Sequence, residues 1–344
     1  MSSERALEVA VFGATGLVGR EIVTLLEERS VPVGHLSLFA TEGSEGERIE
    51  LAGESVAVSR VPKELPEVDV AFLCATGELS REVAEELAED GALVIDLAAA
   101  GHEDAPLLLG AGDLGSTPRT RRGGLIVRVP DPLTRMIAVP LRALASAFGP
   151  RRAIATAVVP ASAFGRKSVD RLSEETIGLL NFQHAEIDED EEDEEGEEGD
   201  AERPQGMAFR GVPETPTDPA SVSARAAYEL PKLLPFPLSL AVSGLRAPIF
   251  SGLAVSLSVE LVSPTTADAV HAALREAPSL VVGEPGGTSI STYDVLGAEG
   301  IYVLGMRHDA NDPAWIHFWV LADNVRHGAA LAAVSLAEGI LLKH

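Results

Sequence analysis

The sequence predicts an α/β protein, with a doubly wound parallel sheet in its N-terminal part and an α+β domain with a mixed or antiparallel sheet in its later part. Three observations carry this prediction. A glycine-rich segment, residues 13–19, lies between an apolar run and a helical pattern. Strand-like and helix-like segments alternate through the first half, whereas strands outnumber helices in the second. Apolar residues make up 46% of the chain and aromatic residues only 4%, which indicates the aliphatic core of a buried parallel sheet.

In the first half, strands and helices are expected in turn, an order that implies right-handed crossovers. Apolar residues such as Ile22, Leu25 and Leu26 share one helical face and indicate a helix over residues 18–28. A second helix is expected over residues 79–89. The expected strands are residues 8–12, 36–40, 68–73, 92–96 and 124–128.

The second half has longer strand-like runs with wider spacing between them. The strands expected there are residues 153–159, 251–261, 302–304 and 316–321, and the helices are residues 169–180, 267–274 and 328–342. We expect residues 1–131 and 324–344 to form a dinucleotide-binding domain, and residues 132–323 to form a catalytic-type and dimerisation domain.

A strongly acidic segment interrupts the second half. Thirteen acidic residues and no Lys or Arg lie between Glu186 and Glu202. Such a composition cannot bury apolar surface, so we expect residues 185–203 to be a disordered, solvated insertion. A docking segment for an unknown basic partner is the alternative.

Composition excludes several classes of function. The formal net charge is −26, half of it from the acidic segment, and no basic stripe is present to meet nucleic-acid phosphates. No apolar run reaches the ~20 residues of a membrane span, and the N-terminus lacks the charged and then apolar pattern of a signal peptide.

The cysteine and histidine content also limits the chemistry. The single cysteine, Cys74, rules out an intramolecular disulfide framework. No Cys, His and Asp cluster has metal-ligand spacing. We therefore expect a soluble, cytoplasmic protein without a metal.

The glycine-rich segment has the spacing and context of a Rossmann-type dinucleotide-binding turn. Gly13 permits the tight turn, Gly16 lets the backbone approach a pyrophosphate, and Gly19 allows the helix and strand to pack closely. The helix N-terminus then attracts phosphates. The expected cofactor-binding residues here are Gly13, Ala14, Thr15, Gly16, Leu17, Val18 and Gly19. A glycine-rich turn without a ligand is the alternative.

The end of the second predicted strand bears on the choice of cofactor. Thr41 and Glu42 lie there, and an acidic residue at this point can bond the ribose 2′-hydroxyl, whereas a 2′-phosphate requires an arginine. No Lys or Arg follows until Arg48. If a cofactor binds, NAD is therefore favoured over NADP. Glu42 is equally well explained as an ordinary solvated acid.

Three segments resemble bacterial aspartate-semialdehyde dehydrogenases, and the resemblance covers nearly the whole chain outside the acidic segment. They are Val9-Ala-Val-Phe-Gly-Ala-Thr-Gly-Leu-Val-Gly-Arg-Glu21, Leu245-Arg-Ala-Pro-Ile-Phe-Ser-Gly252 and Trp319-Val-Leu-Ala-Asp-Asn-Val-Arg-His-Gly-Ala-Ala330. By these motifs the chain is identified as a member of that family.

The resemblance implies a homodimer formed by the central domain, and a nucleotide domain that includes the last helix. Enzymes of this family use NADPH to reductively dephosphorylate aspartyl phosphate to aspartate semialdehyde. A cysteine thiolate forms a thioester, a histidine handles the protons, and arginines bind the substrate. Asn324 stands where the family places a residue beside the nicotinamide, although a helix N-cap explains Asp323 and Asn324 equally well.

The departures from the family fall on the reacting groups. Where the family has Asn-Pro-Asn-Cys-Ser-Thr, this chain has Val129-Pro-Asp-Pro-Leu-Thr134, so Pro132 occupies the position of the nucleophile. Val159 replaces the glutamine that supports the cysteine, and Leu253 replaces the histidine. Proline has no side-chain nucleophile and leucine carries no proton. The family reaction is therefore expected to be lost.

The substrate and cofactor arginines are only partly kept. Arg246 is retained on the substrate side, whereas His102 stands at another substrate arginine. Gly43 stands where the family has the arginine that reads the 2′-phosphate. Cys74 ends a predicted strand near the cofactor edge of the sheet and is a candidate replacement nucleophile, although a buried structural cysteine is the commoner case.

Three functions from different classes remain open. The first and favoured one is a catalytically degenerate homologue with a binding, sensing or structural role. The second is a true aspartate-semialdehyde dehydrogenase of amino-acid biosynthesis. The third is an NAD(P)-dependent oxidoreductase of altered chemistry that transfers hydride without a covalent intermediate.

Overall fold

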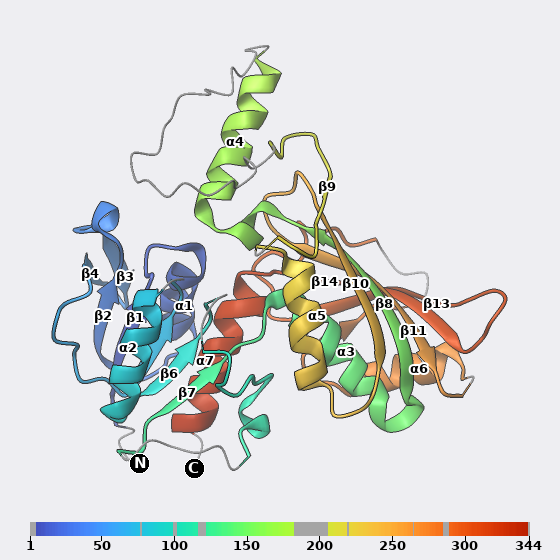
Figure 1. Cartoon of the computed structure of the whole chain (residues 1–344), viewed down its shortest axis with the longest axis horizontal. Coiled ribbons are helices and arrows are strands. Elements are labelled where there is room, and N and C mark those ends of the chain that lie inside the picture. The colour runs from blue at the N-terminus through green and yellow to red at the C-terminus, as the bar shows by residue number, and fades with distance from the viewer. Residues whose placement is uncertain are drawn as a thin grey trace.

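The computed structural model describes residues 5–75, 78–98, 102–115, 122–181, 206–218, 220–263, 265–284 and 289–342. The acidic segment expected at 185–203 lies outside these residues. Two seven-stranded sheets organise the described chain, and Figure 1 shows them side by side with helices packed against each. This arrangement confirms the predicted fold class. No helix among the described residues has the length and apolar character needed to cross a bilayer.

The first sheet has the strand order β3-β4-β2-β1-β5-β6-β7. Its strands are β1 (Leu7–Phe12), β2 (Val33–Phe39), β3 (Arg48–Leu51), β4 (Glu54–Ser59), β5 (Val70–Leu73), β6 (Leu93–Asp96) and β7 (Leu125–Arg128). All neighbours pair in parallel except β3, which forms an antiparallel hairpin with β4 at the edge. The strand order reverses between β1 and β5, so the turn after β1 lies at the switch point where doubly wound sheets bind ligands.

Helices cover both faces of the first sheet. Residues of α2 (Glu78–Glu89) pack on one face, with Leu87 against Phe12 and Leu73 in one cluster. On the other face lie α1 (Leu17–Glu28) and the C-terminal α7 (Leu331–Leu341), which share a core with β1 and β6. Figure 1 shows α7 returning to this sheet from the far end of the chain. The final helix was predicted from residue 328, but residues Arg326–Ala330 form a π-helical turn before it.

The second sheet has the order β12-β13-β14-β11-β8-β10-β9 and is mixed. Its strands are β8 (Pro150–Val159), β9 (Val212–Pro213), β10 (Ser239–Arg246), β11 (Leu253–Leu261), β12 (Leu280–Val282), β13 (Ile301–His308) and β14 (Trp315–Ala322). The pairs β8–β10 and β12–β13 are parallel, and the others are antiparallel. One face packs against α3 (Pro132–Phe148), α5 (Val222–Leu233) and α6 (Ala267–Arg275). The helix α4 (Arg166–Leu180) projects away from both sheets in Figure 1.

Two helices that position the candidate site were not predicted from the sequence. Helix α3 contains Pro140 and α5 contains Pro231, and a proline inside a helix removes a backbone donor, which obscures the pattern. The signals for α3 were present at its ends. Asp131 caps the first turn by accepting the Leu133 amide, and Gly149 ends the helix in the left-handed conformation.

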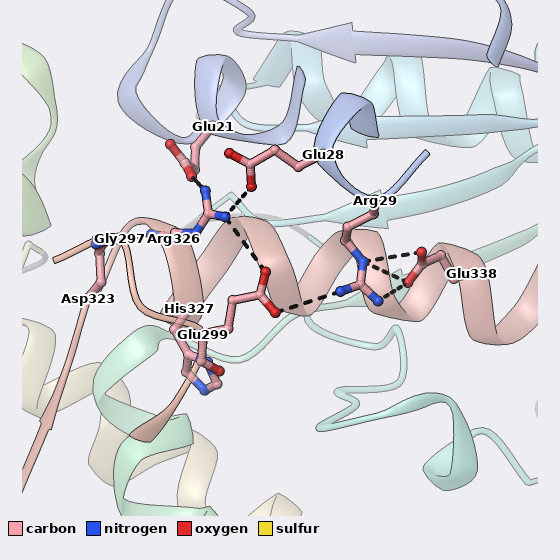
Figure 2. A network of polar contacts seen from close by, with 9 residues as sticks. All are labelled: Glu21, Glu28, Arg29, Gly297, Glu299, Asp323, Arg326, His327 and Glu338. Carbon is pink, nitrogen blue, oxygen red and sulfur yellow. Dashed lines mark hydrogen bonds and ion pairs between the residues drawn. The ribbon is translucent and has the colours of Figure 1, made fainter. Parts of the chain in front are cut away.

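Arg326 anchors the C-terminal segment to α1. Its guanidinium donates to Glu21 at 2.6 Å and to Glu28, and it also lies 3.6 Å from Glu299 (Figure 2). Glu299 in turn approaches Arg29, which donates to Glu338 of α7. The Arg326 side chain is only 12% exposed, so these pairs are shielded from water more than surface pairs are. Six charged groups thereby join α1, the π-helical turn and α7.

We predict that Arg326→Met lowers the free energy of unfolding by about 1–3 kcal/mol, because it leaves Glu21 and Glu28 without the cation that they share. Urea denaturation followed by far-UV circular dichroism measures this. Arg29→Met is the matched control, since Arg29 is more exposed and shares only Glu299 with Arg326; we expect a smaller loss. An equal loss of unfolding free energy in the two variants would contradict the conclusion that Arg326 contributes most to this network.

Candidate nucleotide site and substituted catalytic positions

The glycine turn connects β1 to α1 at the switch point of the first sheet. Gly13 has a φ of +81°, which favours glycine, and a Cβ there would lie 2.9 Å from the Ala75 amide nitrogen. A Cβ on Gly19 would overlap the Gly13 carbonyl, so glycine allows α1 to pack against the turn. Gly16 caps α1 without any side-chain bond to the helix amides. The N-terminus of α1 therefore presents free backbone donors, the arrangement that binds phosphates.

The other residues expected at the nucleotide lie around this turn. Ala14 is fully buried in the core of the first sheet, while Leu17 and Val18 begin α1. The Thr15 hydroxyl donates to the Ser44 hydroxyl at 3.1 Å, which joins the glycine turn to the short 3₁₀ turn Glu42–Ser44 after β2. Thr41 caps that turn.

Asn324 lies at the junction of the two sheets and is bonded to the second one. Its side-chain oxygen accepts from the Ser162 hydroxyl at 3.1 Å and from the Gly252 amide at 3.2 Å. The capping role belongs to Asp323 instead, since its carboxylate accepts the amides of Val325 and Arg326. Asn324 therefore positions the loops that follow β8 and β10 relative to the end of β14.

A buried polar network surrounds the start of α3. The Glu229 carboxylate from α5 accepts from the Asp131 amide at 2.9 Å and from the Thr134 hydroxyl at 2.8 Å, and lies 3.5 Å from the Arg128 guanidinium. Arg225 donates to the Asp131 carboxylate at 3.2 Å. The Glu229 side chain is only 2% exposed, so these bonds replace the water that it would otherwise hold.

Arg246, at the end of β10, is engaged by acids of its own chain. It donates to Asp218, lies 3.8 Å from the Glu214 carboxylate, and its guanidinium covers the Phe164 ring at 4.4 Å. Glu214 also accepts the amides of Val222 and Ser223 at the start of α5. The carboxylates that hold Arg246 are thus themselves part of the fold.

Comparisons with known proteins match two family models to this chain, one in the part that forms the first sheet and one in the part that forms the second. Residues 8–111 match the family model "Semialdehyde dehydrogenase, NAD binding domain", and residues 223–327 match "Semialdehyde dehydrogenase, dimerisation domain". The chain is 30% identical to aspartate-semialdehyde dehydrogenase 2 of Vibrio cholerae, over 96% of each chain. It belongs to the aspartate-semialdehyde dehydrogenase family.

A relative with a different name is as similar to this chain as the Vibrio cholerae protein is. The chain is 30% identical to a USG-1 protein homolog of Azotobacter vinelandii, over 98% of each chain. Among solved structures, a probable aspartate-semialdehyde dehydrogenase from Pseudomonas aeruginosa is 30% identical over 99% of each chain, with a TM-score of 0.86. The enzyme of Vibrio cholerae in complex with ASA is 29% identical, with a TM-score of 0.85.

Apolar side chains stand at the three positions where the sequence predicted substitution of the family's reacting groups. Pro132 is the first residue of α3 and packs against the π-helical turn, because a Cβ on Gly328 would lie 2.5 Å from the Pro132 Cβ. Val159 and Leu253 are 0% and 1% exposed and belong to one hydrophobic cluster with Leu133. Pro132, Val159 and Leu253 thus lie at the start of α3, the end of β8 and the start of β11.

Cys74, the candidate replacement nucleophile, follows β5 and donates its amide to the Phe12 carbonyl. Burial raises the pKa of the Cys74 thiol well above its usual range, and the Asp96 carboxylate adds to that rise. A thiol with a raised pKa holds little thiolate, the form that attacks carbonyl carbon. This environment is typical of a structural cysteine.

The histidines have more definite roles than the sequence indicated. His102 places Nδ1 3.2 Å from the Asp96 carboxylate. His327 donates through Nδ1 to the Glu299 carbonyl at 2.7 Å, and burial lowers its pKa to about 4. Only a protonated Nδ1 can donate to a carbonyl, so His327 is a neutral donor at neutral pH. No group of three or more His, Cys, Asp or Glu in the described part of the chain is placed to hold a metal ion.

Sequence reasoning missed the polar residues of the site, because they come from segments far apart in the chain. Asp131 and Glu229 are 98 residues apart, and α5 was not predicted. The one available signal was local: an Asp-Pro pair before an apolar run is typical of a helix start.

Asp131 makes the network sensitive to pH. Burial raises the pKa of its carboxyl to about 6, with Glu229 and Glu214 adding to the rise and Arg225 opposing it. Because this pKa is higher in the folded protein than the ~4 of an unfolded chain, the ionised form is disfavoured by folding. The contribution of Asp131 to stability is thus complete below about pH 4 and is lost as the pH rises through about 6.

We therefore predict that Asp131→Asn, which keeps the cap but removes the charge, gains stability relative to the parent protein between pH 4.5 and 7.5. The expected gain is on the order of 1–3 kcal/mol, measured by urea denaturation at each pH. Asp113→Asn is the control, because Arg142 lowers the pKa of Asp113 and no such gain is expected. If the unfolding free energies of Asp131→Asn and the parent protein changed with pH in the same way, the raised pKa of Asp131 would be contradicted.

Proposed function

We propose that this chain is a non-acylating member of the aspartate-semialdehyde dehydrogenase family that binds a nicotinamide dinucleotide in a sensing or structural role. The observation that carries the proposal is Pro132. A proline at the nucleophile's position removes the atom on which the family's thioester forms, and its ring fills the space against Gly328.

The surroundings of Pro132 give no substitute for the lost chemistry. Leu253 stands in place of the proton carrier and is buried in an apolar cluster. The thiol of Cys74 has a raised pKa and lies at the end of β5. Arg246 is already paired with Asp218, so a substrate carboxylate must compete with a bond inside the protein. On this proposal, Pro132, Leu253 and Cys74 do not supply the reacting groups of acyl transfer, and Arg246 is not an open anion site.

The nucleotide half of the site supports retained binding. Its tight turn, its open helix N-terminus and the close packing at Gly19 are the features that a dinucleotide pyrophosphate needs. We propose that the chain is divided into two domains, one that binds the dinucleotide and one that carries the catalytic-type and dimerisation surfaces. Residues 1–131 with 324–344 form the dinucleotide-binding domain, and residues 132–323 form the catalytic-type and dimerisation domain.

We predict that the purified chain binds NAD or NADP in calorimetry but shows no turnover with aspartate semialdehyde, phosphate and NADP. Gly16→Asp is expected to abolish binding, because it places a carboxylate where the pyrophosphate lies. Asp is also a favoured N-cap, so thermal stability should be kept. Cys74→Ala should leave binding unchanged.

Turnover that Cys74→Ala abolishes would refute the loss of catalysis and make Cys74 the nucleophile. Turnover that survives Cys74→Ala would instead favour an oxidoreductase of altered chemistry. Absence of binding by either dinucleotide would leave only a structural role.

The open face of the second sheet supports a homodimer, which we also propose. One row of paired residues across β10, β8, β11 and β14 consists of Ser243, Thr156, Ser256 and Trp319. Trp319 is 41% exposed, and Ile154 beside this row is 49% exposed. Flat faces of small polar residues with exposed aromatic and aliphatic side chains are suited to a second copy of the same face. The family's dimerisation domain, matched over residues 223–327, includes part of this face.

We expect sedimentation equilibrium to show a dimer, and Thr156→Arg with Trp319→Lys to give a folded monomer, because like charges would meet across the two-fold axis. Phe209→Lys, which changes an exposed aromatic residue outside both sheets, is the control and should stay dimeric. A monomeric parent protein would refute the proposal.

A further inference from the structure

Arg60 stands at the nucleotide edge of the first sheet, which the linear sequence does not reveal. Strands β2 and β4 pair in parallel, with Leu38 beside Val58 and Phe39 beside Ser59. Their carboxyl ends therefore meet, and Arg60, which follows β4, lies next to the turn that follows β2. The expectation that no arginine is available near Glu42 before Arg48 is thus incomplete, because the missing cation comes from the neighbouring strand.

The Arg60 guanidinium is held by two acids of that turn. It donates to Glu42 through Nη2, and to Glu45 through Nε at 2.7 Å. The side chains of Arg60, Glu42 and Glu45 are 51%, 78% and 50% exposed. Ion pairs this exposed contribute little to stability, so Arg60 can exchange one partner for another without cost to the fold.

The turn lies close to the glycine segment. Ser44 accepts the bond from Thr15, and Gly43 stands between Glu42 and Ser44. A Cβ on Gly43 would have no neighbour within 4 Å, so the place of the family's 2′-phosphate arginine is open space. Arg60 reaches the same turn from the side. The adenosine end of a dinucleotide bound at the glycine turn would therefore meet the Glu42 and Arg60 pair.

The two side chains favour different cofactors. The Glu42 carboxylate accepts a hydrogen bond from a ribose 2′-hydroxyl but repels a 2′-phosphate. Arg60 attracts a 2′-phosphate through paired, charge-assisted hydrogen bonds. With two carboxylates on one guanidinium, the local charge is negative. The wild-type chain should accordingly prefer NAD, with Arg60 holding Glu42 in place.

On this basis we propose that Arg60 and Glu42 form the discriminator between NAD and NADP, with Arg60 a latent 2′-phosphate site that Glu42 masks. The proposal rests on the proposed dinucleotide binding and specifies its selectivity. In this arrangement, Arg60, which follows β4, and Glu42, in the turn after β2, take the place of the single arginine that the family uses to bind the 2′-phosphate.

Calorimetric titration of the full-length chain with NAD and with NADP tests the discriminator. Glu42→Gln removes the repulsion and releases Nη2 of Arg60, while Glu45 still holds Nε, so the ratio of NADP to NAD affinity should rise by about tenfold or more. The double variant Glu42→Gln with Arg60→Ala should lose that gain. Glu47→Gln is the matched control, because Glu47 pairs with Arg20 rather than with Arg60, and its ratio should equal that of the parent.

The outcomes separate the discriminator from the binding site itself. If the chain binds a dinucleotide but Glu42→Gln changes the ratio by less than about twofold, the discriminator is refuted and binding stands. A gain that persists in the double variant also refutes the role of Arg60. If neither the parent nor any variant binds either dinucleotide, the proposed binding function fails, and the discriminator fails with it.

Discussion

The ion pairs of Arg326 hold together the parts of the molecule on which the site depends. Glu21 and Glu28 project from α1, the helix that begins at the glycine turn, and Arg326 begins the π-helical turn after β14 of the second sheet. The same turn presses Gly328 against Pro132. One partly buried guanidinium therefore ties the helix that begins at the glycine turn to the segment that contacts Pro132, and Figure 2 shows its contacts with Glu21, Glu28 and Glu299.

The proposed loss of the reacting groups would leave a site refilled by the protein's own side chains. At the positions concerned, this chain has the Pro132 ring and the buried Val159 and Leu253, and Arg246 is paired with Asp218. Buried charges are costly unless they are paired, and truncating one partner leaves the other unpaired. The network of Asp131, Arg225 and Glu229 is therefore expected to resist simple restoration of activity by a single substitution at residue 132.

Local sequence patterns predicted much of the first sheet and its helices, because burial on both faces gives each strand a continuous apolar run. They failed for β3 and β4, which form an edge hairpin with many exposed residues, and for α3 and α5, each of which contains a proline. The glycine turn was found because its residues are contiguous. The network around Glu229 was not, because it joins segments about a hundred residues apart.

Residue identities along the chain predict the loss of the reacting groups, since neither Pro132 nor Leu253 carries a group that could react, and they specify the glycine turn. Only the tertiary structure decided which charges meet. It brought Arg60 to Glu42 through the parallel pairing of β2 and β4, and it paired Arg246 with Asp218. The physical reason is that an ion pair depends on the distance between two groups in space. Periodicity along the chain carries no information about such distances between separate segments.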